Sequence, residues 1–208
     1  MSHHTWIHSL ARACVKPLVD TPVTPNHITA VRLVTGLAAA GTLAVGGSPW
    51  INLGAGLFVL SFLLDRADGE LARLSGKTSP EGHKYDVIAD SVCNALIFVG
   101  LGFSLRDSAF GLWAILLGLV AGAAVITVLA MVMKLESTQG QRAAELHGYN
   151  RFDPDDAMLV IPFAIWLGWS TPLLFVAAIG TPVFAVIFFL IFRHQFSLVF
   201  AKSLFSSE

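Results

Sequence analysis

Apolar runs long enough to cross a membrane recur along almost the whole of this 208-residue chain. About 20 such residues make one helical crossing, and only helices and closed barrels satisfy their backbone polar groups in lipid. Hydrophobic residues make up 55% of the sequence and charged residues only 13%, whereas soluble domains carry about 25% charged residues. We therefore expect an all-α, polytopic membrane protein. The net charge is −1, and no polybasic tail indicates a nucleic-acid partner.

The apolar runs and the turn residues between them predict six transmembrane helices. They are expected over residues 28–45, 50–64, 85–105, 111–133, 157–169 and 173–192. Asn26 should cap the first, and the tight turn 46–49 should lead into the second. The second should continue as a helix into a polar stretch, and Pro182 is a predicted kink in the sixth.

The first 20 residues predict a short amphipathic helix. Apolar residues recur at helical spacing, while Arg12 and Lys16 lie on the other face. A tryptophan, Trp6, together with a basic face is typical of a helix in the membrane interface, although an ordinary solvent-exposed helix would also fit. The expected organisation is thus a juxtamembrane helix over residues 1–20 and a six-helix transmembrane domain over residues 21–208.

Lysine and arginine residues are concentrated on one side of the predicted topology. They occur before the first span, in the loops after the second and fourth spans, and after the sixth, whereas the opposite side carries only Arg106. Because such residues favour the cytoplasmic side, we expect both termini and the polar stretch to be cytoplasmic, in a bacterial-type inner membrane.

The polar stretch runs from Asp65 to Asp90 between two apolar runs. Asp65 and Asp68 are three residues apart, and Asp86 and Asp90 are four apart, so each pair shares one face of a helix. Turn residues between the pairs predict a loop over which two helices fold back on each other; these are Gly76, Pro80 and Gly82. Four converging carboxylates repel one another unless a cation lies among them, and hard divalent cations prefer oxygen ligands.

This stretch resembles the signature of the CDP-alcohol phosphotransferase family. The matching positions are Asp65, Asp68, Gly69, Ala72, Arg73, Gly82, Asp86 and Asp90. The spacing is D-x-x-D-G-x-x-A-R, then eight intervening residues, then G-x-x-x-D-x-x-x-D. The start of the first span, Thr24 to Thr29, resembles the family more weakly. A coincidental polar connector between helices would need no such fixed spacing.

The resemblance implies a reaction and a set of roles. A phosphoalcohol group would pass from a CDP-linked donor to an acceptor hydroxyl, with release of CMP. Two divalent ions, Mg²⁺ or Mn²⁺, would be held by Asp65, Asp68, Asp86 and Asp90, and Asp90 would be the catalytic base or a pure metal ligand. Donor-binding residues would be Asn26, Thr29, Gly69, Ala72, Arg73, Ser79 and Gly82. Helix capping explains Asn26 and Thr29 equally well, and Arg32 would either reach the membrane interface or face the site.

The acceptor is expected to contact the polar segment after the fourth span. Candidate residues are Lys134, Arg142 and Arg151. Family members that use phosphorylated polyols tend to carry several basic residues here, whereas this segment turns acidic at Asp153, Asp155 and Asp156. This departure favours a neutral hydroxyl acceptor, such as a lipid alcohol, or one carrying an amine. The donor would be CDP-diacylglycerol or another CDP-alcohol.

Two further expectations concern partners and the competing function. The family is commonly dimeric in the membrane, and small residues at Gly100, Gly102, Gly118 and Gly122 would permit close helix packing between copies or within one chain. The alternative function is a transporter or channel that uses the aspartates as a cation path. Against it, the fourth to sixth predicted spans contain no matching acids.

Overall fold

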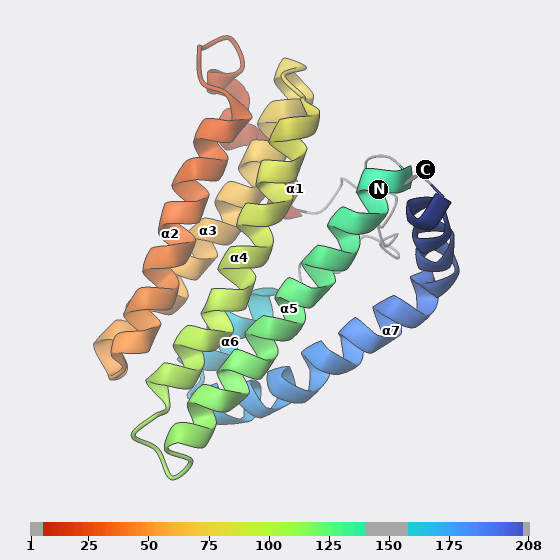
Figure 1. Cartoon of the computed structure of the whole chain (residues 1–208). Coiled ribbons are helices and arrows are strands. Elements are labelled where there is room, and N and C mark those ends of the chain that lie inside the picture. The colour runs from red at the N-terminus through yellow and green to blue at the C-terminus, as the bar shows by residue number, and fades with distance from the viewer. Residues whose placement is uncertain (1–5, 140–157, 206–208) are drawn as a thin grey trace.

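The computed structural model describes residues 6–139 and 158–205, and every regular element in these ranges is a helix (Figure 1). The elements are α1 (Trp6–Val15), the 3-10 helix η1 (Lys16–Leu18), α2 (Pro25–Val45), α3 (Ser48–Ser75), α4 (Pro80–Ser104), α5 (Leu112–Gln139), α6 (Val160–Trp166) and α7 (Ser170–Phe205). The all-α prediction is confirmed for the described residues.

Five of the described helices are long and apolar enough to cross a membrane: α2, α3, α4, α5 and α7. The count of six is not confirmed, because the segment expected to form the fifth span, 157–169, contains α6, a helix of seven residues. At 1.5 Å per residue, such a helix falls far short of the hydrocarbon thickness. α6 instead buries Ile161, Ala164 and Ile165 and packs against α3 and α7. The protein is an integral membrane protein with at least these five apolar helices.

Two short connections fix how α2, α3 and α4 follow one another. Gly46 and Gly47 both have φ of 80°, a conformation that glycine adopts without steric cost, and they join α2 to α3 directly. α3 ends at Ser75 with Gly76 as its C-cap, and α4 begins at Pro80, five residues before the predicted start. Proline fits the first helical turn because its missing N–H needs no partner there. The predicted loop is therefore shorter, and Gly82 lies inside the first turn of α4.

Small residues bring the helices close together within the chain. A Cβ atom added at Gly100 of α4 would lie 2.5 Å from the Ala40 carbonyl oxygen of α2. One added at Gly118 of α5 would lie 2.5 Å from the Phe98 carbonyl oxygen of α4. Gly102 and Gly122 likewise face neighbouring helices of the same chain. All four glycines are thus used in intrachain packing, so they provide no support for a dimer.

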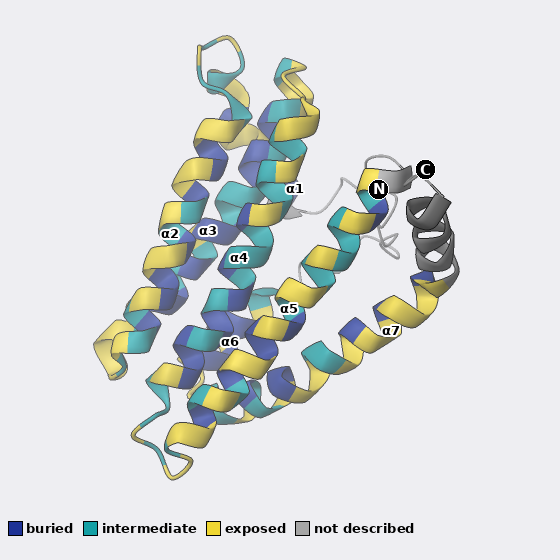
Figure 2. Cartoon of the chain, viewed as in Figure 1, coloured by how far each residue is buried: buried dark blue, intermediate teal, exposed yellow. Residues whose placement is uncertain are grey.

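The largest apolar core contains residues of α2 to α7, with Leu43, Phe58, Leu101, Ile165 and Leu174 among its buried residues. Two smaller buried clusters lie between α5 and α7 and between α1, α2 and α3. The outward faces of the long helices carry exposed apolar side chains, as Figure 2 shows for α2, α5 and α7. Because lipid rather than water surrounds a transmembrane helix, such exposure is expected here.

The N-terminal helix α1 packs against α3. His8, Ala11 and Val15 are buried, at helical spacing, while the Arg12 side chain is half exposed. Leu10, one of the apolar residues at helical spacing in this segment, is 47% exposed. Contact with α3 therefore decides which face of α1 is covered. The location of α1 in a membrane interface stays a prediction.

Candidate active site

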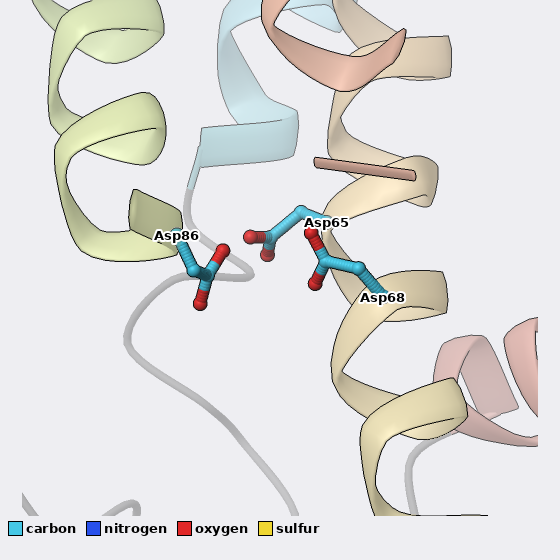
Figure 3. Close-up of side chains that lie close together, drawn as sticks. All are labelled: Asp65, Asp68 and Asp86. Carbon is cyan, nitrogen blue, oxygen red and sulfur yellow. The ribbon is translucent and has the colours of Figure 1, made fainter. Parts of the chain in front are cut away.

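Three of the four motif aspartates bring their carboxylates together where α3 and α4 face each other. Asp65 and Asp68 lie one turn apart on α3, and Asp86 lies in the second turn of α4. One carboxylate oxygen from each lies within 4.8 Å of the other two, and Figure 3 shows the three side chains pointing toward one another. Asp68 is buried, whereas Asp65 and Asp86 are partly exposed.

Asp90, the fourth motif aspartate, lies one turn further along α4 and outside that three-carboxylate group. Its Oδ1 atom accepts hydrogen bonds from Asn94 at 3.0 Å and from Arg32 at 2.5 Å. The Asp90 side chain is 43% exposed, so its carboxyl group remains accessible from the solvent side.

Arg32 of α2 supplies the positive charge at the centre of the cluster. Its Nη1 atom lies 2.7 Å from Oδ1 of both Asp65 and Asp86, and its side chain is only 2% exposed. A buried guanidinium is costly unless paired, and this one bridges both helices of the motif. Arg32 therefore faces the site and does not reach out to the membrane interface. The sequence feature that could have predicted this is its position three residues after Thr29, on the same face of α2.

Thr29 directly supports a motif carboxylate. Its hydroxyl donates to Asp68 Oδ2 at 2.7 Å, and its side chain is buried. The same hydroxyl lies 3.1 Å from the Pro25 carbonyl oxygen, one turn back along α2. Thr29 therefore orients Asp68, a role that was not predicted.

The start of α2 meets the start of α4 beside the cluster. Thr24, and not Asn26, is the N-cap of α2, and it forms a capping box with His27. Proline occupies the first turn, which moves Asn26 inside the helix and sends its side chain toward α4. A Cβ atom at Gly82 would lie 3.0 Å from both Asn26 Oδ1 and Ser79 Oγ. Three of the predicted donor-binding residues thus lie together, and a side chain larger than that of glycine at the centre would press on the other two.

Arg73 lies near the end of α3 and pairs with Glu70, a residue that the sequence analysis missed. Arg73 Nη2 donates to Glu70 Oε1 at 2.8 Å. The Glu70 side chain is fully buried and also contacts His8 and Arg12 of α1. The Arg73 guanidinium lies beside Gly69, where an added Cβ would be in van der Waals contact with Nη2 at 3.4 Å. The spacing of Glu70 and Arg73, three residues apart, was the available signal.

Of the three predicted acceptor residues, only Lys134 lies within the described ranges. Lys134 is exposed in the last turns of α5. Arg142 and Arg151, together with Asp153, Asp155 and Asp156, lie outside the described residues. Near Lys134, His83 Nε2 of α4 lies 3.1 Å from Glu136 Oε2 of α5. This pair joins α5 to the end of α4 that carries Asp86.

The carboxylate oxygens of the cluster are suitable ligands for a hard divalent cation. The three-carboxylate group offers only oxygen ligands, which Mg²⁺ and Mn²⁺ prefer. Arg32 already neutralises part of this negative charge. A cation that takes these carboxylates as ligands therefore has to share them with the guanidinium or displace it.

Two curated proteins are similar to part of the chain. The Bifunctional IPC transferase and DIPP synthase of Rubrobacter xylanophilus is 37% identical over 84 residues, which cover 40% of this chain and 19% of that protein. The protein of the same name from Thermococcus kodakarensis is 32% identical over 111 residues, covering 53% of this chain and 25% of that protein. The matched segment is thus a quarter or less of the length of each relative.

The sequence profile described as CDP-alcohol phosphatidyltransferase matches residues 22–187. That range contains α2, α3 and α4, and with them every residue of the aspartate cluster and Arg32. The match covers most of the chain, and it agrees with the resemblance of the motif between Asp65 and Asp90. The chain belongs to the CDP-alcohol phosphatidyltransferase family.

Proposed function

We propose that this protein transfers a phosphoalcohol group from a CDP-linked donor to an acceptor hydroxyl, releasing CMP, as a step of phospholipid synthesis. The observation that carries the proposal is the convergence of Asp65 and Asp68 of α3 with Asp86 of α4, near the point where Asn26 and Ser79 flank Gly82. Family membership supports it, as do the relatives named for IPC transferase and DIPP synthase activity.

The aspartates would hold divalent metal ions. Asp65, Asp68 and Asp86 form the group best suited to one ion, and Asp90 would contribute to a second. Mg²⁺ or Mn²⁺ bound there would neutralise charge on the donor pyrophosphate. Arg32 would offset the mutual repulsion of the carboxylates in the absence of the metal and would add positive charge to the site.

Asp90 is the proposed general base. In the reaction, the acceptor oxygen forms a bond to the β-phosphorus of the donor, the bond from that phosphorus to the bridging oxygen breaks, and CMP leaves with that oxygen. The acceptor proton passes to Asp90. Two features support this role: Asp90 lies outside the three-carboxylate group, and its side chain is 43% exposed, which leaves it open to an incoming hydroxyl.

Arg73 would bind the donor phosphates, because a guanidinium offers a planar fork of donors to phosphate oxygens. Asn26, Ser79 and Gly82 would contact the nucleotide where α2 and α4 begin. Gly69 and Ala72 are small, so the donor can approach the α3 backbone beside Arg73. Thr29 would act through Asp68 by keeping that carboxylate oriented.

The acceptor is proposed to enter near the end of α5. Lys134 is the described candidate for contact with it, and Arg142 and Arg151 are proposed with it. The acidic residues between 153 and 156 favour a neutral hydroxyl or an amine-bearing acceptor. The donor is proposed to be CDP-diacylglycerol or another CDP-alcohol.

Topology and assembly complete the proposal. The aspartate cluster, the start of α2 and the end of α5 lie at one end of the bundle (Figure 1). Lysine and arginine residues are concentrated near this end, which supports a cytoplasmic site in a bacterial-type inner membrane. A homodimer within the membrane is also proposed, by analogy with the family.

CMP release tests the reaction. Protein purified in detergent is given Mg²⁺ or Mn²⁺, CDP-diacylglycerol or soluble CDP-alcohols, and a panel of hydroxyl acceptors. Asp90→Asn should abolish CMP release, whereas Asp107→Asn should not, because Asp107 is 87% exposed beyond the far end of α4. Absence of CDP binding by the unchanged protein would refute the proposal.

The alternative function, a transporter or channel with a cation path through the aspartates, has less support. Among the described residues, α5 and α7 carry one acidic residue, Glu136, so these two helices do not extend the aspartate cluster into a path across the membrane.

A further inference from the structure

Glu70 is a fully buried carboxylate shared by three basic side chains from two helices. Its Oε1 atom lies 3.0 Å from His8 Nδ1 and 2.8 Å from Arg73 Nη2. Its Oε2 atom accepts from Arg12 Nε at 3.0 Å. Because a buried carboxylate without partners is strongly disfavoured, this geometry ties α1 to α3 at a fixed point.

The same carboxylate restrains Arg73 from one side only. Arg73 is held by Glu70 through Nη2, while its side chain remains 35% exposed. The flat guanidinium lies beside Gly69. A long side chain on a helix end would otherwise sample many rotamers, and binding an anion would have to order it. Glu70 therefore presents Arg73 in one orientation before the donor arrives.

The charge balance of the cluster favours an anionic ligand. Glu70 supplies one negative charge, and Arg12 and Arg73 supply two positive charges, so the group is positive overall even with His8 neutral. The excess charge lies at the end of α3 next to the motif. A carboxylate that merely fastened α1 to α3 would need one basic partner; here it also holds a motif residue.

We propose that α1 positions Arg73 for the donor phosphates through Glu70, which makes His8, Arg12 and Glu70 positioning residues for donor binding. The inference rests on the proposed function, in which Arg73 binds the donor. Arg12 and His8 fix the carboxylate, the carboxylate fixes the guanidinium, and α1 thereby contributes to the site without touching the substrate.

A double-mutant cycle on the full chain tests this chain of contacts. Affinity for CDP with Mg²⁺ is measured by calorimetry, and donor KM, acceptor KM and kcat are measured by CMP release. Arg12→Ala should weaken CDP binding and raise donor KM by about fivefold to tenfold, with kcat and acceptor KM little changed. Arg12→Lys should restore most of the affinity. Asp107→Asn serves as the control.

The decisive comparison is Arg12→Ala in an Arg73→Ala background. If Arg12 acts through Arg73, the double variant should bind CDP as weakly as Arg73→Ala alone. Glu70→Gln should likewise weaken CDP binding alone but cause no further loss when it is combined with Arg73→Ala. If the buried amide prevents Glu70→Gln from folding, the comparison with Arg12→Ala still tests the inference. An unchanged factor for Arg12→Ala in both backgrounds would overturn the inference. If Arg73→Ala binds CDP as tightly as the unchanged protein, both the inference and the donor role of Arg73 are overturned. If the unchanged protein does not bind CDP, the proposed function itself is refuted.

Discussion

Replacing Arg32 by methionine should make the stability of the protein depend on divalent cations. Methionine keeps an unbranched apolar side chain but removes the charge that now contacts Asp65, Asp86 and Asp90. Removing one partner of a buried ion pair costs about 3–5 kcal/mol. Here the Asp86 and Asp90 side chains are 38% and 43% exposed, so solvent screens part of the repulsion. We expect a loss of about 2–3 kcal/mol without divalent cations.

A bound cation should offset most of this loss. A ligand at 100 times its Kd stabilises the folded state by about 2.7 kcal/mol, and the variant has no guanidinium competing for the carboxylates. At about 2–4 °C per kcal/mol for a chain of this size, Tm should fall by about 5–10 °C in EDTA and recover in Mg²⁺.

Thermal unfolding in detergent, followed by intrinsic fluorescence with EDTA or Mg²⁺, measures both effects. Arg106→Met is the matched control, since Arg106 lies at the other end of α4 and binds the Ala44 and Val45 carbonyl oxygens. Its Tm should be equally low with and without Mg²⁺. The reasoning is refuted if Arg32→Met unfolds at the wild-type temperature in EDTA, or if Mg²⁺ raises its Tm no more than that of the unchanged protein.

Three other changes have defined outcomes. Asp90→Asn should lower the rate of CMP release by about 10²–10⁴-fold while CDP binding persists; equal losses of both would contradict a role as base. Thr29→Val should raise the Mg²⁺ concentration for half-maximal activity by about 10–100-fold, whereas Thr42→Val, whose hydroxyl bonds only carbonyl oxygens of its own helix, should leave it unchanged. Gly100→Ala should destabilise the fold by about 1–3 kcal/mol, because its Cβ would lie 2.5 Å from a carbonyl oxygen of α2. In thermal unfolding, the control Gly180→Ala, whose Cβ would have no atom within 4 Å, should not lower Tm. Equal Tm values for the two variants would argue against close packing at Gly100.

Spacing along the chain, with the turn residues between the pairs, predicted that Asp65, Asp68 and Asp86 converge, but not that Asp90 lies outside their group. Residues three or four apart share a helix face whatever the surroundings, so the pairs on α3 and α4 followed from the sequence, as did the glycine turn before α3. The centre of the site did not follow. Arg32 enters it from a third helix, and only the packing of α2 against both motif helices reveals that contact.

The missed features share this origin in tertiary contacts. The motif specifies no residue type at the position of Glu70, and the burial of Glu70 depends on α1 packing against α3. The early start of α4 depended on local chemistry instead: Ser79 accepts a hydrogen bond from the Gly82 N–H at 3.0 Å, and Pro80 starts the helix. Hydropathy alone did not separate a short buried helix such as α6 from a span, because both are apolar.

Arg32 and all four motif aspartates come from one uninterrupted segment, residues 25–104, in which α2, α3 and α4 are joined by short turns. The part of the chain beyond residue 104 holds the proposed acceptor contacts, Lys134, Arg142 and Arg151, and none of these five side chains. In the proposed function, reaction chemistry and choice of acceptor would therefore be encoded in successive parts of the chain. Exchanging the part beyond residue 104 between relatives would be a route to new acceptors that leaves the aspartate–arginine centre in place.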